Sequence, residues 1–286
     1  MLQQTDRLAL AVPDADEAAT ALNAIFDSVV IDDTVDSDAN ARRITLQWGR
    51  DQLEIYEPKG PGPAADFVSG GKRGLFAGGF ALNDPAAVAA RIEQAGIKVT
   101  QQGDRFVVYP EDLRGTGVIL SPTAERETRV GLMDKIWQIT YTVPDLDESV
   151  AFYSDLFGVE DKLTNLYTSS AWGYHAAITW FEAKKGAPLD SLEYLDPFEH
   201  EKAAGRFLAK TNGIGGIYMS TVHTENLPEI KERVESTGGG WEGMPGGSLG
   251  FIHPRRTFGL LLGVSSFDSI DARRPTPENP NAWGNH

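Results

Sequence analysis

A strand pattern followed by a helix pattern opens the chain. Leu8, Leu10 and Val12 alternate with less apolar positions, as in a strand that buries one face. A Pro-Asp pair follows, and Asp14 stands where a helix N-cap belongs, with Glu17 three residues later as in a capping box. The pattern predicts a strand and then a helix.

The same order returns in the second half of the chain and indicates a duplicated domain. Residues 12–17 read Val-Pro-Asp-Ala-Asp-Glu, and residues 143–148 read Val-Pro-Asp-Leu-Asp-Glu. The separation between matched segments grows along the chain, as insertions in loops of the second copy would cause. The later matched pairs are 54–58 with 193–197, and 117–120 with 259–262.

Each copy contains further strand and helix signals. Residues 43–49 and 52–56 predict a hairpin, and a strand, a helix and a strand follow within 80–120. We therefore expect an α+β protein in which each copy holds two βαβββ modules. The polar segment after Pro122 is typical of a linker. The predicted units are an N-terminal domain at 1–123, a C-terminal domain at 133–267 and a proline-rich tail at 268–286.

Composition narrows the class of protein. With 286 residues, of which 41% are hydrophobic and 23% charged, the chain is typical of a globular protein of about two domains. A net charge of −15 argues against nucleic acid as a partner, and no apolar run is long enough to predict a membrane span. The first residues lack the pattern of a signal peptide, so we expect a cytoplasmic protein.

Two segments of the second copy carry a family resemblance. Residues 135–146 and 151–159 resemble the opening strand, acidic turn and helix of vicinal-oxygen-chelate domains, the superfamily of glyoxalases, bleomycin-resistance proteins and extradiol dioxygenases. Residues 192–197 and 213–221, together with 252–264, resemble methylmalonyl-CoA epimerases. The resemblance implies that each domain is a cup-shaped sheet. It also implies a divalent metal held in the cup by three or four side chains.

The ligand positions implied by this resemblance are mostly replaced in the second copy. They fall on Gln138 on the first strand, on Glu193, at or next to Gly216, and on Gly263. One carboxylate and one amide make a poor metal site. We expect no metal and no other cofactor here, with iron or manganese disfavoured.

The first copy departs from the family pattern in the same way. Its corresponding positions are Arg7, Glu54, Ala77 and Ser121. A cation would meet an arginine there, so we expect Arg7 and Glu54 to form a structural ion pair. The N-terminal domain is accordingly predicted to be non-catalytic.

Glu193 is the strongest candidate for catalysis without a metal. It lies between apolar residues of a strand, where an inward carboxylate is costly unless it is used or paired. His175 lies on a strand predicted to pair with that of Glu193, so the histidine and the carboxylate could act as a base and its orienter. An exposed or satisfied imidazole is the alternative.

Other residues are candidates for substrate binding. Gln138, Tyr141 and Tyr218 could donate hydrogen bonds to a substrate oxygen, although strand tyrosines also pack in cores. The remaining candidates are Trp180 as part of an aromatic pocket or a larger core, and Arg255 with Arg256 as an anion-docking pair or a solvated turn.

Two classes of function compete. The leading hypothesis is a metal-independent enzyme that performs lyase or isomerase chemistry on a small aromatic or carbonyl compound in the C-terminal cup. The alternatives are a non-catalytic binding or resistance protein, a divergent extradiol-type dioxygenase, and a scaffold with both cups filled. The expected partner is a small molecule, and a homodimer is compatible with the sequence.

Overall fold

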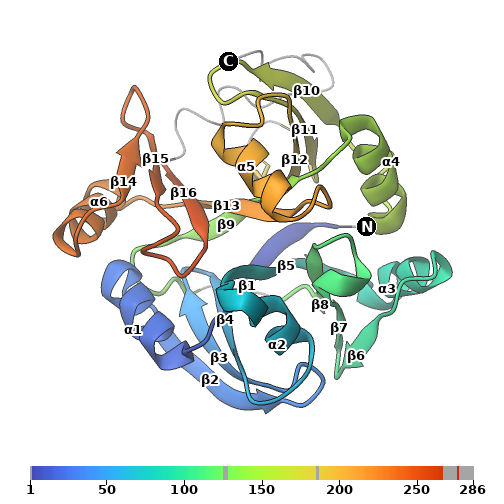
Figure 1. The fold of residues 1–286 in the computed structure, drawn as a ribbon, viewed down its shortest axis with the longest axis horizontal. Helices are drawn as coiled ribbons and strands as arrows, with labels where there is room; N and C mark the ends of the chain where they lie inside the picture. Colours follow the sequence, from blue (N-terminus) through green and yellow to red (C-terminus); the bar gives the residue numbers. More distant parts are fainter. Residues whose placement is uncertain (1, 125–127, 185–186, 267–275, 277–286) are drawn as a thin grey trace.

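The protein, described by a computed structural model, folds into two curled eight-stranded sheets, one from each half of the chain (Figure 1). The structure describes residues 2–124, 128–184, 187–266 and 276. The predicted α+β class and the duplication are confirmed, because both sheets have the same strand order. The predicted tail lies outside the described residues except for Thr276. No helix in the described ranges is long and apolar enough to span a membrane.

The N-terminal domain consists of two βαβββ modules with a short helix between them. The first module contains β1 (Gln4–Ala11), α1 (Ala15–Phe26), β2 (Val29–Asp36), β3 (Ala41–Trp48) and β4 (Asp51–Pro58). The connection contains α2 (Pro63–Val68) and η1 (Ser69–Gly71). The second module contains β5 (Gly74–Leu82), α3 (Pro85–Gln94), β6 (Thr100–Gln102), β7 (Arg105–Val108), η2 (Pro110–Asp112) and β8 (Gly117–Pro122).

The C-terminal domain repeats this plan. Its first module contains β9 (Lys135–Thr142), α4 (Leu146–Phe157), β10 (Thr164–Ser169), β11 (Tyr174–Trp180) and β12 (Ser191–Pro197). Helix α5 (Ala203–Lys210) connects the modules. The second module contains β13 (Gly216–His223), α6 (Leu227–Ser236), β14 (Trp241–Gly243), β15 (Leu249–Ile252) and β16 (Leu261–Ser265).

The predicted helix starts are confirmed by their caps. The Asp14 carboxylate accepts a hydrogen bond from the backbone N–H of Glu17 at 2.8 Å, and Asp145 accepts one from Glu148 at 2.9 Å. Helix α4 ends at Phe157, and Gly158 follows it with a φ of 67°, in the left-handed region that glycine adopts without strain. The repeated Pro-Asp sequence therefore ends a strand and starts a helix in both domains.

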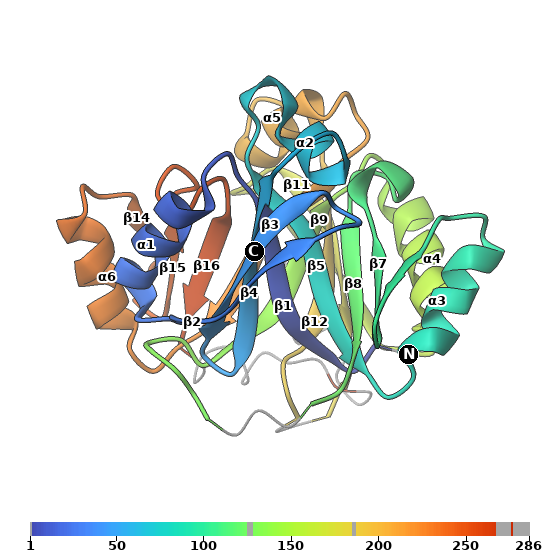
Figure 2. The same ribbon diagram turned by 90° about the horizontal axis from the view of Figure 1, so that it is seen from below.

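The central strands of each sheet join its two modules. Strand β1 pairs with β5 antiparallel, and β9 pairs with β13 in the same way. The two sheets lie back to back through these strands, because one hydrophobic core contains residues of both domains, including Leu8 and Ile139. Figure 2 shows α1 beside α6 and α3 beside α4 at the two sides of this core. The inner, concave faces of the sheets consequently point away from each other.

Candidate functional site

The alternation of side chains along β9 and β12 places Glu193 at the centre of the C-terminal inner face. Within β9, Ile139 and Tyr141 belong to the core shared by the two domains, so Gln138, Thr140 and Thr142 lie on the inner face. Glu193 pairs with Thr140 on one side and with Ile178 of β11 on the other. The polar residues of the inner face are therefore set by strand register.

Glu193 is buried and bonded only to neutral hydroxyl groups. Its Oε2 accepts a hydrogen bond from Thr140 Oγ1 at 2.7 Å, and its Oε1 accepts one from Tyr167 Oη at 2.5 Å. Only 6% of the residue is exposed. Burial raises the pKa of the carboxyl group, and the two hydrogen bonds oppose this effect only in part. A carboxyl group with a raised pKa is a stronger base than an ordinary glutamate, which suits it to proton transfer.

The corresponding carboxylate of the N-terminal domain has the opposite environment. Glu54 Oε1 accepts hydrogen bonds from Arg7 Nη1 at 2.9 Å and Arg105 Nη1 at 2.7 Å, and Oε2 accepts one from Tyr56 at 2.7 Å. Burial would raise the pKa of Glu54, but Arg7, Arg105 and Arg43 outweigh it and the net shift is downward. The predicted Arg7–Glu54 ion pair is confirmed, and Arg105 is a partner that the sequence did not indicate.

The rest of the N-terminal inner face is filled by side chains of the protein itself. Ala9, Tyr56, Phe76 and Tyr109 form a second hydrophobic cluster, and Phe67 of α2 packs on Phe76 with ring centroids 5.4 Å apart. Together with the ion network this leaves the duplicated glutamate without access to a ligand. The filled face supports the expectation of a non-catalytic N-terminal domain, which stays a prediction.

Register also corrects one proposed ligand position. The inner-face residue of β13 beside Gln138 is Thr221, whereas Gly216 pairs with Thr142 near the start of the strand. Gly216 therefore does not lie beside Gln138, because the first residues of β13 lie beyond the level of Gln138. Gly263 does lie beside Thr221, and a β-carbon there would be 3.0 Å from the Thr221 hydroxyl.

These residues do not fit a divalent transition metal. The candidate donors are the Glu193 carboxyl group, the Gln138 amide and the Thr221 hydroxyl, of which only one is a carboxylate. Sites for such metals usually combine several histidine, cysteine or carboxylate ligands. Within the described residues no three of these side chains come together in a way that could hold a metal ion.

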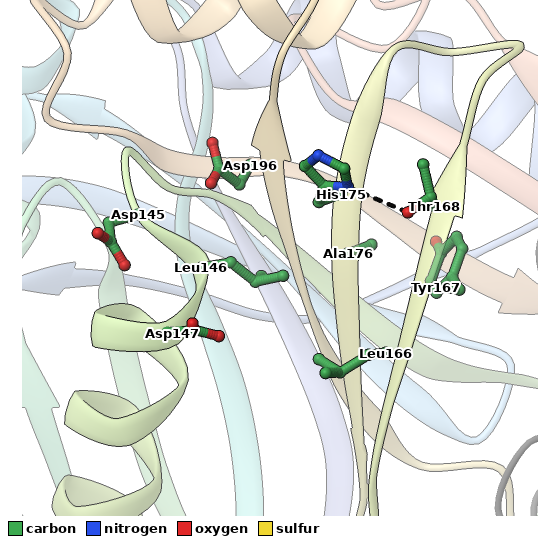
Figure 3. A pocket seen from close by; sticks show the side chains of 9 residues that line it. All are labelled: Asp145, Leu146, Asp147, Leu166, Tyr167, Thr168, His175, Ala176 and Asp196. Carbon is green, nitrogen blue, oxygen red and sulfur yellow. Dashed lines mark hydrogen bonds between the residues drawn. The ribbon is translucent and has the colours of Figure 1, made fainter.

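The structure does not bring His175 to Glu193. Strands β11 and β12 pair as predicted, but His175 lies opposite Asp196 while Glu193 lies opposite Ile178. His175 and Ile178 differ by an odd number of positions along the strand, so the side chain of His175 points to the outer face. There its Nδ1 lies 3.0 Å from Thr168 Oγ1 (Figure 3). The predicted pair of a histidine base and a carboxylate orienter, His175 and Glu193, is wrong for this reason.

The outer face near His175 carries an open pocket of about 460 Å³. Asp145 and Asp147 line it from the start of α4, and Asp196 and His175 line it from the sheet (Figure 3). Burial raises the pKa of Asp196. Glu193 does not line this pocket, although Tyr167, which bonds to Glu193, does.

The three aromatic candidates for substrate binding lie on different faces of the C-terminal sheet. Tyr141 lies on the outer face, with its ring centroid 5.1 Å from that of Tyr153, so its predicted contact with a substrate in the cup is wrong. Trp180 is buried in the inner-face cluster and donates a hydrogen bond to Asn165 Oδ1 at 2.9 Å. Tyr218 joins this cluster from a bulge in β13, and burial raises its pKa to about 12.

The two arginines have different environments. Arg256 donates hydrogen bonds to the carbonyl groups of Gly238 at 2.6 Å and Gly239 at 3.1 Å, just after the end of α6. Its role is thus to hold a helix end, which corrects the prediction that it docks an anion. Arg255 is exposed, and its role toward an anionic group stays a prediction.

One hydrogen-bond partner of Glu193 was missed from the sequence. Tyr167, which donates to Glu193, lies on β10 and reaches it across β11, so only sheet order connects the two. Trp172, in the turn after β10, contacts Phe251 of β15 with ring centroids 6.1 Å apart. Because these strands lie near opposite ends of the sheet, the contact joins the two sides of the curled sheet at its rim.

Comparison with known proteins supports the fold more than any activity. No family model and no curated protein sequence matches the chain. A mutant of 4-hydroxymandelate synthase from Streptomyces coelicolor has a TM-score of 0.70 at 13% identity, covering 93% of each chain. A xylose isomerase-like TIM barrel/4-hydroxyphenylpyruvate dioxygenase fusion protein has a TM-score of 0.64 at 12% identity, covering 93% of this chain and 49% of its own.

A third similar structure covers one domain. Methylmalonyl-CoA epimerase from Streptomyces coelicolor is 20% identical over 43% of this chain and 100% of its own, with a TM-score of 0.37 that is too low to argue from. The two whole-chain matches and the pair of curled sheets agree with the resemblance noted in the sequence. The chain therefore has the tandem, two-domain fold of the vicinal-oxygen-chelate superfamily.

Proposed function

We propose that the protein is an acid–base enzyme whose C-terminal inner face transfers a proton on a small aromatic or carbonyl compound, with Glu193 as the proton carrier. The observation that carries this proposal is the contrast between the duplicated glutamates. Glu54 is held by arginines in a filled face, whereas Glu193 is buried among neutral partners. That the two whole-chain structural neighbours are enzymes by name supports the same class.

The residues around Glu193 suit proton transfer in both directions. As a base, Glu193 would take a proton from a carbon next to a carbonyl group, and the electron pair would move onto the carbonyl oxygen. As an acid, it would return the proton to the same or a neighbouring carbon. The hydroxyl groups of Thr140 and Tyr167 hold the carboxyl group in place, and each carboxylate oxygen keeps a second lone pair for substrate.

A binding protein is the second candidate. The rim contact of Trp172 with Phe251 and the inner-face cluster around Trp180 would suit the sequestration of an aromatic ligand. In that case Glu193 would serve only as a hydrogen-bonding group. A dioxygenase is disfavoured, because the described inner-face donors do not fit a divalent transition metal.

Deuterium exchange tests the enzyme proposal. The protein is incubated in D2O with a panel of aromatic ketones and keto acids, and deuterium entering the carbon next to the carbonyl group is followed by NMR. We expect exchange above the buffer rate with at least one compound, and its loss by at least about 100-fold in Glu193→Gln. Asp196→Asn is the matched control, since Asp196 lies on the opposite face of the same strand and also has a raised pKa.

The outcomes separate the two candidates. Exchange that survives Glu193→Gln would refute the role of this residue. Binding without exchange for every compound of the panel would favour sequestration. Equal loss in Glu193→Gln and Asp196→Asn would show a general effect of removing carboxyl groups.

A further inference from the structure

Two polar groups on the C-terminal inner face have no partner among the described residues. They are the Gln138 amide nitrogen Nε2 and the Thr142 hydroxyl Oγ1, both fully buried. Each lies two residues from Thr140, on the same face of β9. A buried polar group without a hydrogen bond costs about 1–3 kcal/mol, so a fold tolerates such a pair only at a cost. A ligand that bonds to them would recover this cost.

The first domain shows that the fold itself does not require these groups. The residue that corresponds to Gln138 is Arg7, whose side-chain nitrogens bond to Asp6, Glu54 and Ser121. Thr142 corresponds to Ala11, which has no polar side-chain atom. The polar side chain at these positions is thus hydrogen-bonded within the N-terminal domain, whereas two groups at the corresponding positions of the C-terminal domain are unpaired in the part of the chain that the structure describes.

The strand neighbours of these groups are uncharged apart from Glu193, while the exposed Arg206 of α5 acts electrostatically on Tyr218 of the same face. Neighbouring strands place Met219 beside Thr140, Leu195 beside Thr142 and Ile178 beside Glu193. The hydrogen-bond partners of Glu193 are hydroxyl groups, and no ion pair to it occurs within the described ranges. An anionic ligand beside Gln138 and Thr142 would lose its hydration without gaining an opposite charge from these strand neighbours, and it would face the Glu193 carboxyl group.

We propose that the C-terminal inner face selects an uncharged aromatic carbonyl compound, whose carbonyl oxygen accepts a hydrogen bond from Gln138 Nε2 and whose far polar end bonds to Thr142 Oγ1. The two Cα atoms are roughly 13 Å apart, as four residues of a strand require. A single ring with substituents at both ends suits that separation. This inference rests on the site of the proposed function and specifies its substrate class.

Binding of charge-matched probes tests the proposal without any need for turnover. Benzamide, benzoate and benzamidine have nearly the same shape and are neutral, anionic and cationic at pH 7.5. Their affinities for the full chain are measured by ligand-observed NMR titration. We expect benzamide to bind at least about tenfold more tightly than either charged probe. Equal or tighter binding of benzoate or benzamidine would overturn the proposal, and so would the absence of benzamide binding.

Two near-isosteric variants locate the contacts. Gln138→Leu should weaken benzamide about tenfold, the equivalent of one lost hydrogen bond of about 1.4 kcal/mol. Thr142→Val should weaken 4-hydroxybenzamide more than benzamide. Tyr141→Phe is the matched control, since it removes an unpaired buried hydroxyl from the opposite face of the same strand. Thermal unfolding confirms that each variant is folded, and unchanged affinities in both folded test variants would overturn the assignment.

The binding and exchange experiments fail independently. Exchange of an anionic keto acid that depends on Glu193 would support the enzyme and overturn the selection of uncharged ligands. A clear preference for benzamide without exchange of any ketone would support the selection of uncharged ligands and would count against the enzyme.

Discussion

The duplicated glutamates predict opposite effects of the same substitution on stability. Glu54→Gln removes the negative charge that Arg7 and Arg105 share, and it leaves two buried guanidinium groups with one carboxylate fewer. Glu193→Gln removes a carboxyl group that has only hydroxyl partners. We therefore expect Glu54→Gln to destabilise the fold and Glu193→Gln to stabilise it above neutral pH.

The expected size of the Glu54 effect follows from its contacts. Glu54 accepts bonds at 2.9 Å and 2.7 Å from the two arginines, and its side chain is only 2% exposed. Breaking a buried ion pair on one side costs about 3–5 kcal/mol. Both arginines keep other partners, Asp6 for Arg7 and Asp36 for Arg105, which argues for the lower end. At about 2 °C per kcal/mol, the melting temperature should fall by at least roughly 6 °C.

The pH dependence has opposite signs at the two positions. The pKa of Glu54 is lowered from its usual 4.5, so its contribution to stability is present above 4.5 and is lost as the pH falls through the folded value. The pKa of Glu193 is raised, so its contribution is fully present below 4.5 and is lost as the pH rises through the folded value. The stability gain from Glu193→Gln should therefore appear at pH 8 and vanish near pH 4.

Urea unfolding followed by circular dichroism at pH 8 and at the lowest pH where the protein stays folded measures both effects. The two domains share one core, so a single transition is expected. A loss of stability in Glu193→Gln comparable to that in Glu54→Gln at pH 8 would refute the assigned difference between the two environments. An unchanged free energy of unfolding in Glu54→Gln would also refute that assigned difference.

Three further substitutions have defined outcomes. Arg256→Ala should lower the unfolding free energy by about 1 kcal/mol, because it frees the carbonyl groups after α6, and should leave probe affinities unchanged; weakened benzoate binding would restore an anion site there. Trp172→Ala should speed both association and dissociation of 4-hydroxybenzamide in stopped-flow fluorescence, since it removes the rim contact with Phe251; unchanged rates would show that ligands enter elsewhere. Tyr141→Phe should leave stability equal or raise it by up to about 1 kcal/mol in thermal unfolding, and a clear loss would mean that the hydroxyl group has a partner.

The inner-face residues of β9 and β12 could be predicted from sequence only in part. The family resemblance indicated Gln138, and the repeat matched Glu193 with Glu54. His175 was misassigned because the face of a strand residue relative to its neighbour depends on register, and a shift of one residue reverses it. Thr221 was missed for a related reason, since the start of β13 extends beyond Gln138.

The sequence by itself determined the duplication, the helix starts at Asp14 and Asp145 and the class of fold, because these depend on local patterns and on comparison of the chain with itself. Only the tertiary structure decided what surrounds each glutamate. Arg105 reaches Glu54 from β7, and Tyr167 reaches Glu193 from β10, through contacts between strands that are not neighbours in sequence. The charge state of a buried carboxyl group depends on those contacts, so its chemistry appears only once the sheet is formed.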